Sequence, residues 1–287
     1  MREPERLDAL IRSAAARFRF SQTPMIDARA LAKCAFGLDD AELIARGGDV
    51  AEPEALARFR RMVERRAREE PVAYIVGRRE FWSLEFDLAP GILVPRADSE
   101  ALIEAVVRRR GRDEALGIVD LGCGSGALLC ALIGEFPRAT GLGVDINPEA
   151  VSLTLRNIAR LGFSARAGAR CGDWFNGIGE RFDIVISNPP YIRTADRNAL
   201  PREVRDFESP LALFAGEDGL AAHRAILNGA PGRLADDGLV ILEFGAGQAQ
   251  AVNEIAMAAF PAAHIAAERD LAGRPRALVI DLRPAAL

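Results

Sequence analysis

The sequence predicts an α/β protein: a small helical domain, a β-hairpin, and a larger domain built on a doubly wound parallel sheet. Strand-like apolar segments alternate with helical segments from residue 117 onward, and a glycine-rich loop follows the first of these strands. Residues 1–69, by contrast, show helical periodicity alone. We therefore expect a helical domain at 1–76, a hairpin linker at 77–95 and a sheet-based domain at 96–287.

The first 69 residues have the apolar spacing of short amphipathic helices. One apolar face consists of Leu7, Leu10, Ile11 and Ala14, and another of Leu56, Phe59, Val63 and Ala67. Intervals of three and four residues place each set on one side of a helix. Pro24, Gly47-Gly48 and Pro53 separate the helices.

Opposite the second apolar face, the sequence places arginines at positions 58, 60, 61, 65, 66 and 68. Such a face could dock an acidic partner or ribosomal RNA. A solvated helix surface is the simpler interpretation, and the neighbouring Glu64, Glu69 and Glu70 favour it.

The glycine-rich loop has the features of a cofactor site. Gly117–Leu121 is a short apolar strand that leads into Gly122-Cys123-Gly124-Ser125-Gly126 and then into a helix over 127–136. Glycines let the backbone approach a ligand, and the helix start offers free N–H groups. The next strand, 141–146, contains Asp145 near its end, about 20 residues on, where it can accept hydrogen bonds from a ribose. This pattern predicts a cofactor that contains adenosine, and it fits NAD and S-adenosylmethionine equally well.

Asn188-Pro189-Pro190-Tyr191 follows the apolar strand at 181–187 and suits one kind of reaction. The NH₂ group of an amide or nucleobase is a poor nucleophile, so its methylation needs two fixed acceptors that turn the lone pair towards the electrophile. The Asn188 side-chain oxygen and the Pro189 carbonyl can serve as those acceptors, and the prolines stiffen the turn. Tyr191 offers a flat face to a planar substrate. A tight turn with a packed tyrosine would, however, use the same residues.

The expected topology brings these two motifs together. In a doubly wound sheet the strands at 117–121 and 181–187 lie side by side, and ligands bind beyond their carboxyl ends. The glycine loop and Asn188 should then face each other across one crevice. Asp173-Trp174 would lie on the same rim, with Trp174 either covering an adenine ring or packing in the core. His223 and His264 fall away from these loops, so nothing indicates hydride transfer.

The remaining β segments flank this core. Phe81–Leu88 is expected to form the hairpin. Gly238–Phe244, His264–Glu268 and Arg276–Leu282 are expected strands, with a helix at 248–259. Only a short turn separates the last two strands, so we expect one antiparallel strand at the sheet edge.

Together, these motifs resemble the class I S-adenosylmethionine-dependent methyltransferases that act on amino groups. Further blocks narrow the resemblance to the peptide chain release factor glutamine methyltransferase family. These blocks are Glu70–Gly77, Glu80-Phe81-Trp82, Leu93–Glu100, Val204–Leu213, Gly216–Leu220 and Asp270–Arg276. Ala97 and Ser209 depart from the family pattern, and we expect these departures to concern the substrate contacts rather than the cofactor or the amide chemistry.

The resemblance implies a seven-stranded Rossmann-like methyltransferase domain, with 1–76 as a substrate-recognition domain. It implies direct methyl transfer from S-adenosylmethionine to the side-chain nitrogen (N5) of the Gly-Gly-Gln glutamine in class I release factors. Catalysis would involve Asn188 and Pro189, and substrate binding would add Pro190 and Tyr191. The cofactor would contact Gly122, Cys123, Gly124, Ser125, Gly126, Asp145, Trp174 and Asn188.

Two other functions stay open on the residues alone. One is an adenine- or cytosine-amino methyltransferase on DNA or RNA, since the Asn-Pro-Pro-Tyr motif serves both substrates. The other is a non-catalytic module that uses the cofactor only to dock a translation factor, for which the intact Asn188 and Pro189 would be unnecessary.

Composition sets the remaining expectations. The 287 residues carry a net charge of −4, and 36 of the 37 basic residues are arginine. No broad basic channel is visible, so we expect no direct nucleic-acid binding. The four cysteines lack zinc spacing, so we expect no metal. Five charges within the first ten residues and the lack of a long apolar run argue against a signal peptide or membrane span. We expect a cytoplasmic monomer.

Overall fold

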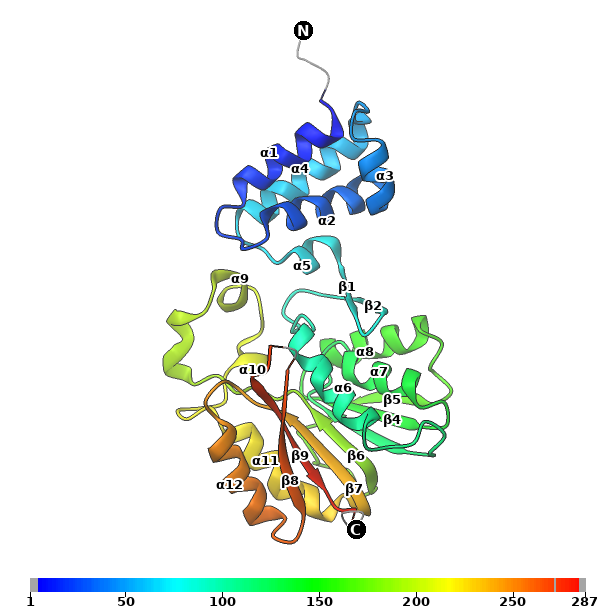
Figure 1. The fold of residues 1–287 in the computed structure, drawn as a ribbon, viewed down its shortest axis with the longest axis vertical. Helices are drawn as coiled ribbons and strands as arrows, with labels where there is room; N and C mark the ends of the chain where they lie inside the picture. The colour runs from blue at the N-terminus through cyan, green and yellow to red at the C-terminus, as the bar shows by residue number, and fades with distance from the viewer. Residues whose placement is uncertain (1–4, 271, 284–287) are drawn as a thin grey trace. The chain divides into compact units, whose positions relative to one another are not determined.

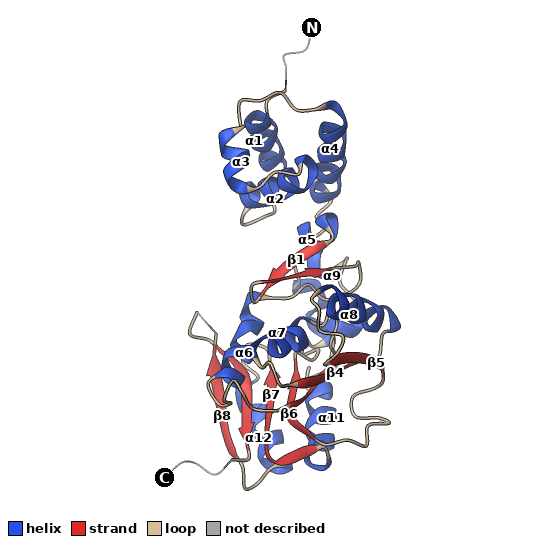
Figure 2. Cartoon of the chain, turned by 90° about the vertical axis from the view of Figure 1, so that its right-hand side faces the viewer, coloured by secondary structure: helices blue, strands red, loops and turns tan. Residues whose placement is uncertain are grey.

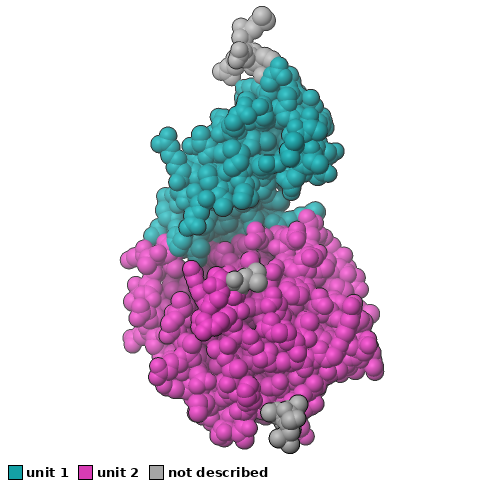
Figure 3. All heavy atoms as spheres, in the orientation of Figure 1, with its two compact units in different colours: residues 1–78, 201–207 teal, residues 79–200, 208–287 magenta. Residues whose placement is uncertain are grey.

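The computed structural model describes residues 5–270 and 272–283. The chain forms two compact units, one of residues 1–78 with 201–207 and the other of residues 79–200 with 208–287 (Figure 3). The sequence prediction of an uninterrupted domain at 96–287 thus missed one feature. A short segment of that range, 201–207, packs with the N-terminal helices.

The first unit is helical, as expected. It consists of α1 (Leu7–Arg17), α2 (Pro24–Phe36), α3 (Asp40–Ala45), α4 (Pro53–Ala67), α5 (Val72–Val76) and α9 (Arg202–Arg205). Proline begins α2 and α4, where its missing N–H costs nothing. The side chains of Phe18, Leu31 and Phe59 are fully buried between the helices.

Most of the arginine-rich face of α4 is used inside this unit. Arg66 is buried and forms ion pairs with Asp27 at 2.7 Å and with Glu203 at 2.8 Å, which ties 201–207 to α4. Arg58, Arg60 and Arg65 bind the Ala35 carbonyl, Glu5 and Glu70, respectively. These contacts favour a structural role for the arginines that make them.

A two-stranded hairpin, β1 (Arg78–Phe81) and β2 (Leu84–Asp87), leads into the second unit. The hairpin was predicted, but it begins three residues earlier than Phe81. Its turn residues Trp82 and Ser83 have φ values of 50° and 58°. Paired left-handed residues fit the twist of a hairpin, although glycine or asparagine usually occupies such positions.

The second unit is built on a seven-stranded sheet with the order β5-β4-β3-β6-β7-β9-β8. The strands are β3 (Gly117–Leu121), β4 (Thr140–Asp145), β5 (Ala167–Cys171), β6 (Phe182–Ser187), β7 (Leu234–Glu243), β8 (His264–Arg269) and β9 (Pro275–Asp281). The predicted neighbours β3 and β6 do pair in parallel. The expected edge position of the antiparallel strand was wrong: β9 is antiparallel to both neighbours, and β8 forms the edge.

Helices cover both faces of this sheet (Figures 1 and 2). Ile118 and Ile184 belong to one core with α6 (Glu100–Val107), α7 (Ala127–Glu135) and α8 (Pro148–Arg160). Val119 and Val185 belong to the other, with α11 (Ala221–Gly229) and α12 (Ala249–Ala259). Successive residues of a strand face opposite sides, so both sides of β3 and β6 are apolar.

Shorter helices lie in the connections: η1 (Ala97–Ser99), η2 (Thr194–Ala199), α10 (Pro210–Leu213) and η3 (Ala230–Gly232). No helix in the described part of the chain has both the length and the apolar character needed to cross a bilayer.

Candidate active site

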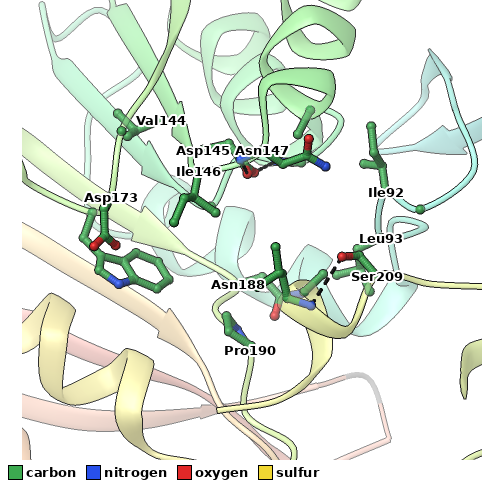
Figure 4. A pocket seen from close by; sticks show the side chains of 18 residues that line it. Ile92, Leu93, Val144, Asp145, Ile146, Asn147, Asp173, Asn188, Pro190 and Ser209 are labelled. Carbon is green, nitrogen blue, oxygen red and sulfur yellow. Dashed lines mark hydrogen bonds between the residues drawn. The ribbon is translucent and has the colours of Figure 1, made fainter. Parts of the chain in front are cut away.

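A pocket of about 240 Å³ lies at the carboxyl ends of the central strands, within the second unit. It is lined by residues 91–93, 122, 124, 144–147, 150, 172–174, 188, 190, 209, 211 and 212. Figure 4 shows Asp145 and Asn188 across the pocket from each other, with Ile92 and Asp173 on the two remaining sides. This is the switch point between β3 and β6, where doubly wound sheets bind ligands.

The glycine loop forms a cradle on one wall. Gly122 and Gly124 have left-handed φ values of 73° and 56°. A Cβ at Gly122 would lie 3.7 Å from Trp174, and one at Gly124 would lie 3.8 Å from Ile92. Trp174 and Ile92 line the pocket, so added side chains would reduce the space between them. The loop therefore leaves room for a ligand close to its backbone, as an adenosyl cofactor requires.

Three other predicted loop residues do not line the pocket. Cys123 is buried with its Sγ 3.4 Å from the Thr154 hydroxyl, and burial raises the pKa of its thiol well above the usual value. Ser125 is buried, and its carbonyl accepts a hydrogen bond from Asn157 at 2.8 Å. A Cβ at Gly126 would lie 2.9 Å from the Thr154 methyl group. These residues shape the loop, and their contact with a cofactor stays a prediction.

The carboxylate of Asp145 is held in position by two backbone groups. One oxygen accepts from the Gly124 N–H and the other from the Asn147 N–H, each at 2.9 Å. A carboxylate oxygen can accept more than one hydrogen bond, so Asp145 keeps acceptor capacity for ribose hydroxyls. The aspartate thus connects the glycine loop to the start of α8 while it lines the pocket.

The structure supports core packing for Trp174 and also places it at the pocket, where its contact with an adenine ring stays a prediction. It lines the pocket and is only partly buried, and it also packs against the hydrophobic core around Val144. Its φ of 49° is unusual for a bulky residue. Ile146, 59% exposed, supplies a second apolar surface to the same pocket.

Asn188 lines the pocket, and its orientation is set by a contact. Its Nδ2 donates a hydrogen bond to the Ser99 hydroxyl at 3.0 Å. One amide N–H is thus bound to Ser99, whereas no hydrogen bond within the described residues occupies the side-chain oxygen, which can accept from a substrate. Pro190 also lines the pocket, whereas Pro189 is buried and does not. The Pro189 role concerns its backbone carbonyl and stays a prediction.

Tyr191 does not line the pocket. Its hydroxyl donates to a Glu243 carboxylate oxygen at 3.2 Å, and burial, followed by the Glu243 charge, raises the pKa of the phenol. This contact gives Tyr191 a structural use, and its expected stacking on the substrate remains untested.

Sequence reasoning missed several parts of the site. Ile92 and Leu93 line the pocket; Leu93 begins the Leu93–Glu100 block, Ile92 directly precedes it, and neither residue carried an assigned role. Ser209, the N-cap of α10, and Leu211, within α10, also line the pocket. Asn147 also lines the pocket; it follows Asp145 by two residues and is the N-cap of α8. An asparagine directly before a proline is a common start of a helix, and this pattern could have located it in the sequence.

Comparison with known proteins adds direct relatives. A family model described as the PrmC N-terminal domain matches residues 9–77, and one described as the methyltransferase small domain matches residues 97–203. The release factor glutamine methyltransferase of Cereibacter sphaeroides is 41% identical over 260 residues, covering 91% of each chain. That of Moorella thermoacetica is 39% identical and covers 89% of this chain and 90% of the relative.

Among solved structures, a 16S rRNA methyltransferase of T. thermophilus in complex with AdoMet and guanosine shares the fold. Its TM-score is 0.51 at 21% identity, covering 72% of this chain and 50% of that chain. The match to the methyltransferase small domain and the identity to curated methyltransferases, together with the strand order and the pocket at the switch point, place the protein among the class I S-adenosylmethionine-dependent methyltransferases. The identity to curated relatives goes further: the chain belongs to the release factor glutamine methyltransferase family.

Proposed function

We propose that the protein methylates the side-chain amide nitrogen (N5) of the glutamine in the Gly-Gly-Gln motif of peptide chain release factors. The observation that carries this proposal is the orientation of Asn188, whose amide nitrogen is bound to Ser99. An acceptor is thereby left at the pocket, which is what a substrate NH₂ group needs. The names of the two curated relatives described above support the same substrate.

The chain's own contribution is positioning. Asn188 and the Pro189 carbonyl each accept one hydrogen of the glutamine amide, which directs the nitrogen lone pair into the pocket. Both hydrogen bonds strengthen as the nitrogen becomes tetrahedral and its hydrogens more acidic. Such alignment lowers the activation free energy by about 7 kcal/mol, the value that corresponds to the lowest effective molarities measured for well-oriented groups. S-adenosylmethionine would supply a sulfonium-activated methyl group for direct displacement: the N–C bond forms as the C–S bond breaks, S-adenosylhomocysteine leaves, and the nitrogen gives up one proton to solvent.

Different residues of the pocket wall would bind different parts of the cofactor. Gly122 and Gly124 would present backbone to a bound cofactor, and Asp145 would accept hydrogen bonds from its ribose hydroxyls. Trp174 and Ile146 offer apolar surfaces for the adenine ring. Closing these surfaces around the cofactor also excludes water from the methyl group.

The two alternative functions lose support. The curated relatives that cover most of the chain are named for glutamine methylation and not for DNA or RNA modification. The net charge of −4 and the engagement of the α4 arginines within their own unit do not suggest a nucleic-acid channel. A non-catalytic module would not need Asn188 held with its acceptor at the pocket.

The central experiment is a label-transfer assay. The protein is incubated with methyl-labelled cofactor and, separately, with a release factor, total RNA or DNA. Label should enter the release factor alone, and changing its acceptor glutamine to alanine should abolish incorporation. Label in RNA or DNA would refute the proposal, and so would label that persists after that change.

We further propose that the helical unit recognises the release factor at a distance from the glutamine. Free glutamine offers few atoms for binding, so specificity must come from the protein around it. Arg61 of α4 and Arg68, its C-cap, are exposed and best placed for an acidic partner, since Arg58, Arg60 and Arg65 bind within the unit. Remote binding energy would help to place the amide at Asn188.

Charge reversal tests this recognition surface. Arg61→Glu with Arg68→Glu should lower kcat/KM on intact release factor and leave it unchanged on a short Gly-Gly-Gln peptide. Arg112→Glu, at an exposed arginine of the other unit, is the matched control. Equal losses on both substrates would mean that the arginines do not bind the release factor.

We expect the enzyme to act as a cytoplasmic monomer that needs no direct contact with nucleic acid. Analytical ultracentrifugation tests the monomeric state.

A further inference from the structure

A buried chain of hydrogen bonds lies behind Asn188. Asn188 Nδ2 donates to Ser99 Oγ at 3.0 Å, and Ser99 Oγ donates to Glu243 Oε2 at 2.5 Å. The Tyr191 hydroxyl donates to the other carboxylate oxygen at 3.2 Å. Ser99 and Glu243 are 3% and 1% exposed. The chain joins η1, the end of β7 and the loop after β6, and the proposed mechanism uses only its Asn188 end.

The direction of each hydrogen bond follows from chemistry. An ionised carboxylate only accepts, so Ser99 must give its single hydroxyl proton to Glu243. Ser99 Oγ can then offer only lone pairs to Asn188, and the Asn188 NH₂ must face it. Rotating the amide by half a turn would set two acceptors against each other and point a donor into the pocket.

Three groups around Glu243 favour its ionised form, although burial, the largest effect, raises its pKa overall. Burial raises the pKa of Glu243, whereas the Ser99 hydroxyl, the positive charge of Arg276 and the Tyr191 hydroxyl oppose that rise. Asp98 adds a further negative charge to the region, and Arg276 pairs with it at 2.8 Å. His223 binds the backbone carbonyl of Glu243 at 2.8 Å, which anchors the end of β7.

We infer that Ser99 and Glu243 are positioning residues that hold the Asn188 amide with its oxygen towards the methyl acceptor. The two ends of an asparagine amide are nearly equal in size, so packing alone does not select one orientation. The direction of the hydrogen bonds through Ser99 does select one orientation of the Asn188 amide. This inference rests on the proposed function, because the acceptor at position 188 matters only if an NH₂ group binds there.

The first test removes the link. Ser99→Ala leaves the amide free to rotate, so kcat should fall about tenfold or more, the scale of one lost hydrogen bond at a reacting group. Affinity for S-adenosylhomocysteine should stay unchanged, because Asn188 is aimed at the acceptor amide. Ser99→Thr keeps the hydroxyl and should keep most of the activity. A wild-type kcat in Ser99→Ala would overturn the inference.

The decisive test reverses the proton direction. Asn188→Asp alone should be severely impaired, because two carboxylates then compete for the one Ser99 proton. Adding Glu243→Gln lets the new amide donate to Ser99 Oγ, and Ser99 can donate to the carboxylate at position 188. The second oxygen of that carboxylate again presents an acceptor to the pocket. The double variant should therefore exceed Asn188→Asp by about tenfold or more in kcat.

Two control variants distinguish the expected rescue by Glu243→Gln from a general effect on folding. Adding Ser99→Ala to the double variant should cancel the rescue, since the relay passes through that hydroxyl. Asp183→Asn, a carboxylate-to-amide change at the amino end of β6, should give no rescue. If Glu243→Gln fails to raise the activity of Asn188→Asp while wild type methylates release factor, the relay is wrong. An inactive wild type would instead refute the proposed function.

Discussion

Replacing Asp145 by alanine should weaken cofactor binding by an amount that follows from its contacts. The carboxylate is the expected partner of the ribose hydroxyls, and it also accepts the Gly124 and Asn147 N–H groups at 2.9 Å. Losing one hydrogen bond to a charged acceptor costs about 1.5–3 kcal/mol. Since about 1.4 kcal/mol is tenfold in affinity, Kd for S-adenosylhomocysteine should rise about 10- to 150-fold. The substitution also frees the N–H groups of Gly124 and Asn147, both in the pocket wall, so we expect a rise in Kd near the upper end of this range.

Isothermal titration calorimetry with S-adenosylhomocysteine measures this loss. The matched control is Asp183→Ala, which removes a carboxylate that accepts the Gly117 N–H at 2.6 Å. Asp183 and Gly117 lie at the starts of β6 and β3, at the opposite edge of the sheet from the pocket. The control should lower the melting temperature and leave Kd unchanged. Unchanged affinity in Asp145→Ala would place the ribose elsewhere and refute the assignment.

Three other outcomes are expected. Asn188→Ala should abolish turnover yet leave cofactor affinity within a few-fold, because it removes an acceptor used mainly in the transition state; a near-normal kcat would contradict the site. EDTA should not affect activity, since the sulfonium needs no metal, and chelator-sensitive turnover restored by one metal would contradict direct transfer. Burial raises the pKa of Asp120 to about 7 from an ordinary 3.8, so the folded state keeps a proton that the unfolded state loses between these values. Without cofactor, the stability of wild type relative to Asp120→Asn should therefore fall as pH rises from 5 to 7 in thermal melts, and a constant difference would show that Asp120 is ionised throughout.

Local patterns in the sequence were sufficient for most elements of the sheet. The strand expected at 117–121 forms at those residues, because a strand buried on both faces is an uninterrupted apolar run. The hairpin was less well placed, since its Trp82-Ser83 turn lacks the glycine or asparagine that marks paired left-handed residues. The position of β9 depends on its pairing with β7, such as Leu239 opposite Asp281, and a short turn does not reveal that pairing.

Contacts between distant segments were beyond local reasoning. Glu203 joins the first unit through Arg66, which lies 137 residues away in the chain. No periodicity near Glu203 indicates such a partner. The same limit applies to Ile92 and Leu93, whose place in the pocket depends on how the chain after the hairpin packs beside the glycine loop.

The sequence by itself determined the kind of chemistry. A glycine loop, an acid about 20 residues later and Asn188-Pro189-Pro190-Tyr191 are each local motifs, and the alternation of strands and helices is enough to bring them to one edge of a sheet. Only the tertiary structure showed what holds the Asn188 amide in the orientation expected from the sequence. That orientation depends on Ser99 and Glu243, 89 residues before and 55 residues after it (188 − 99 and 243 − 188), and on a proton direction that exists only when all three side chains are in contact.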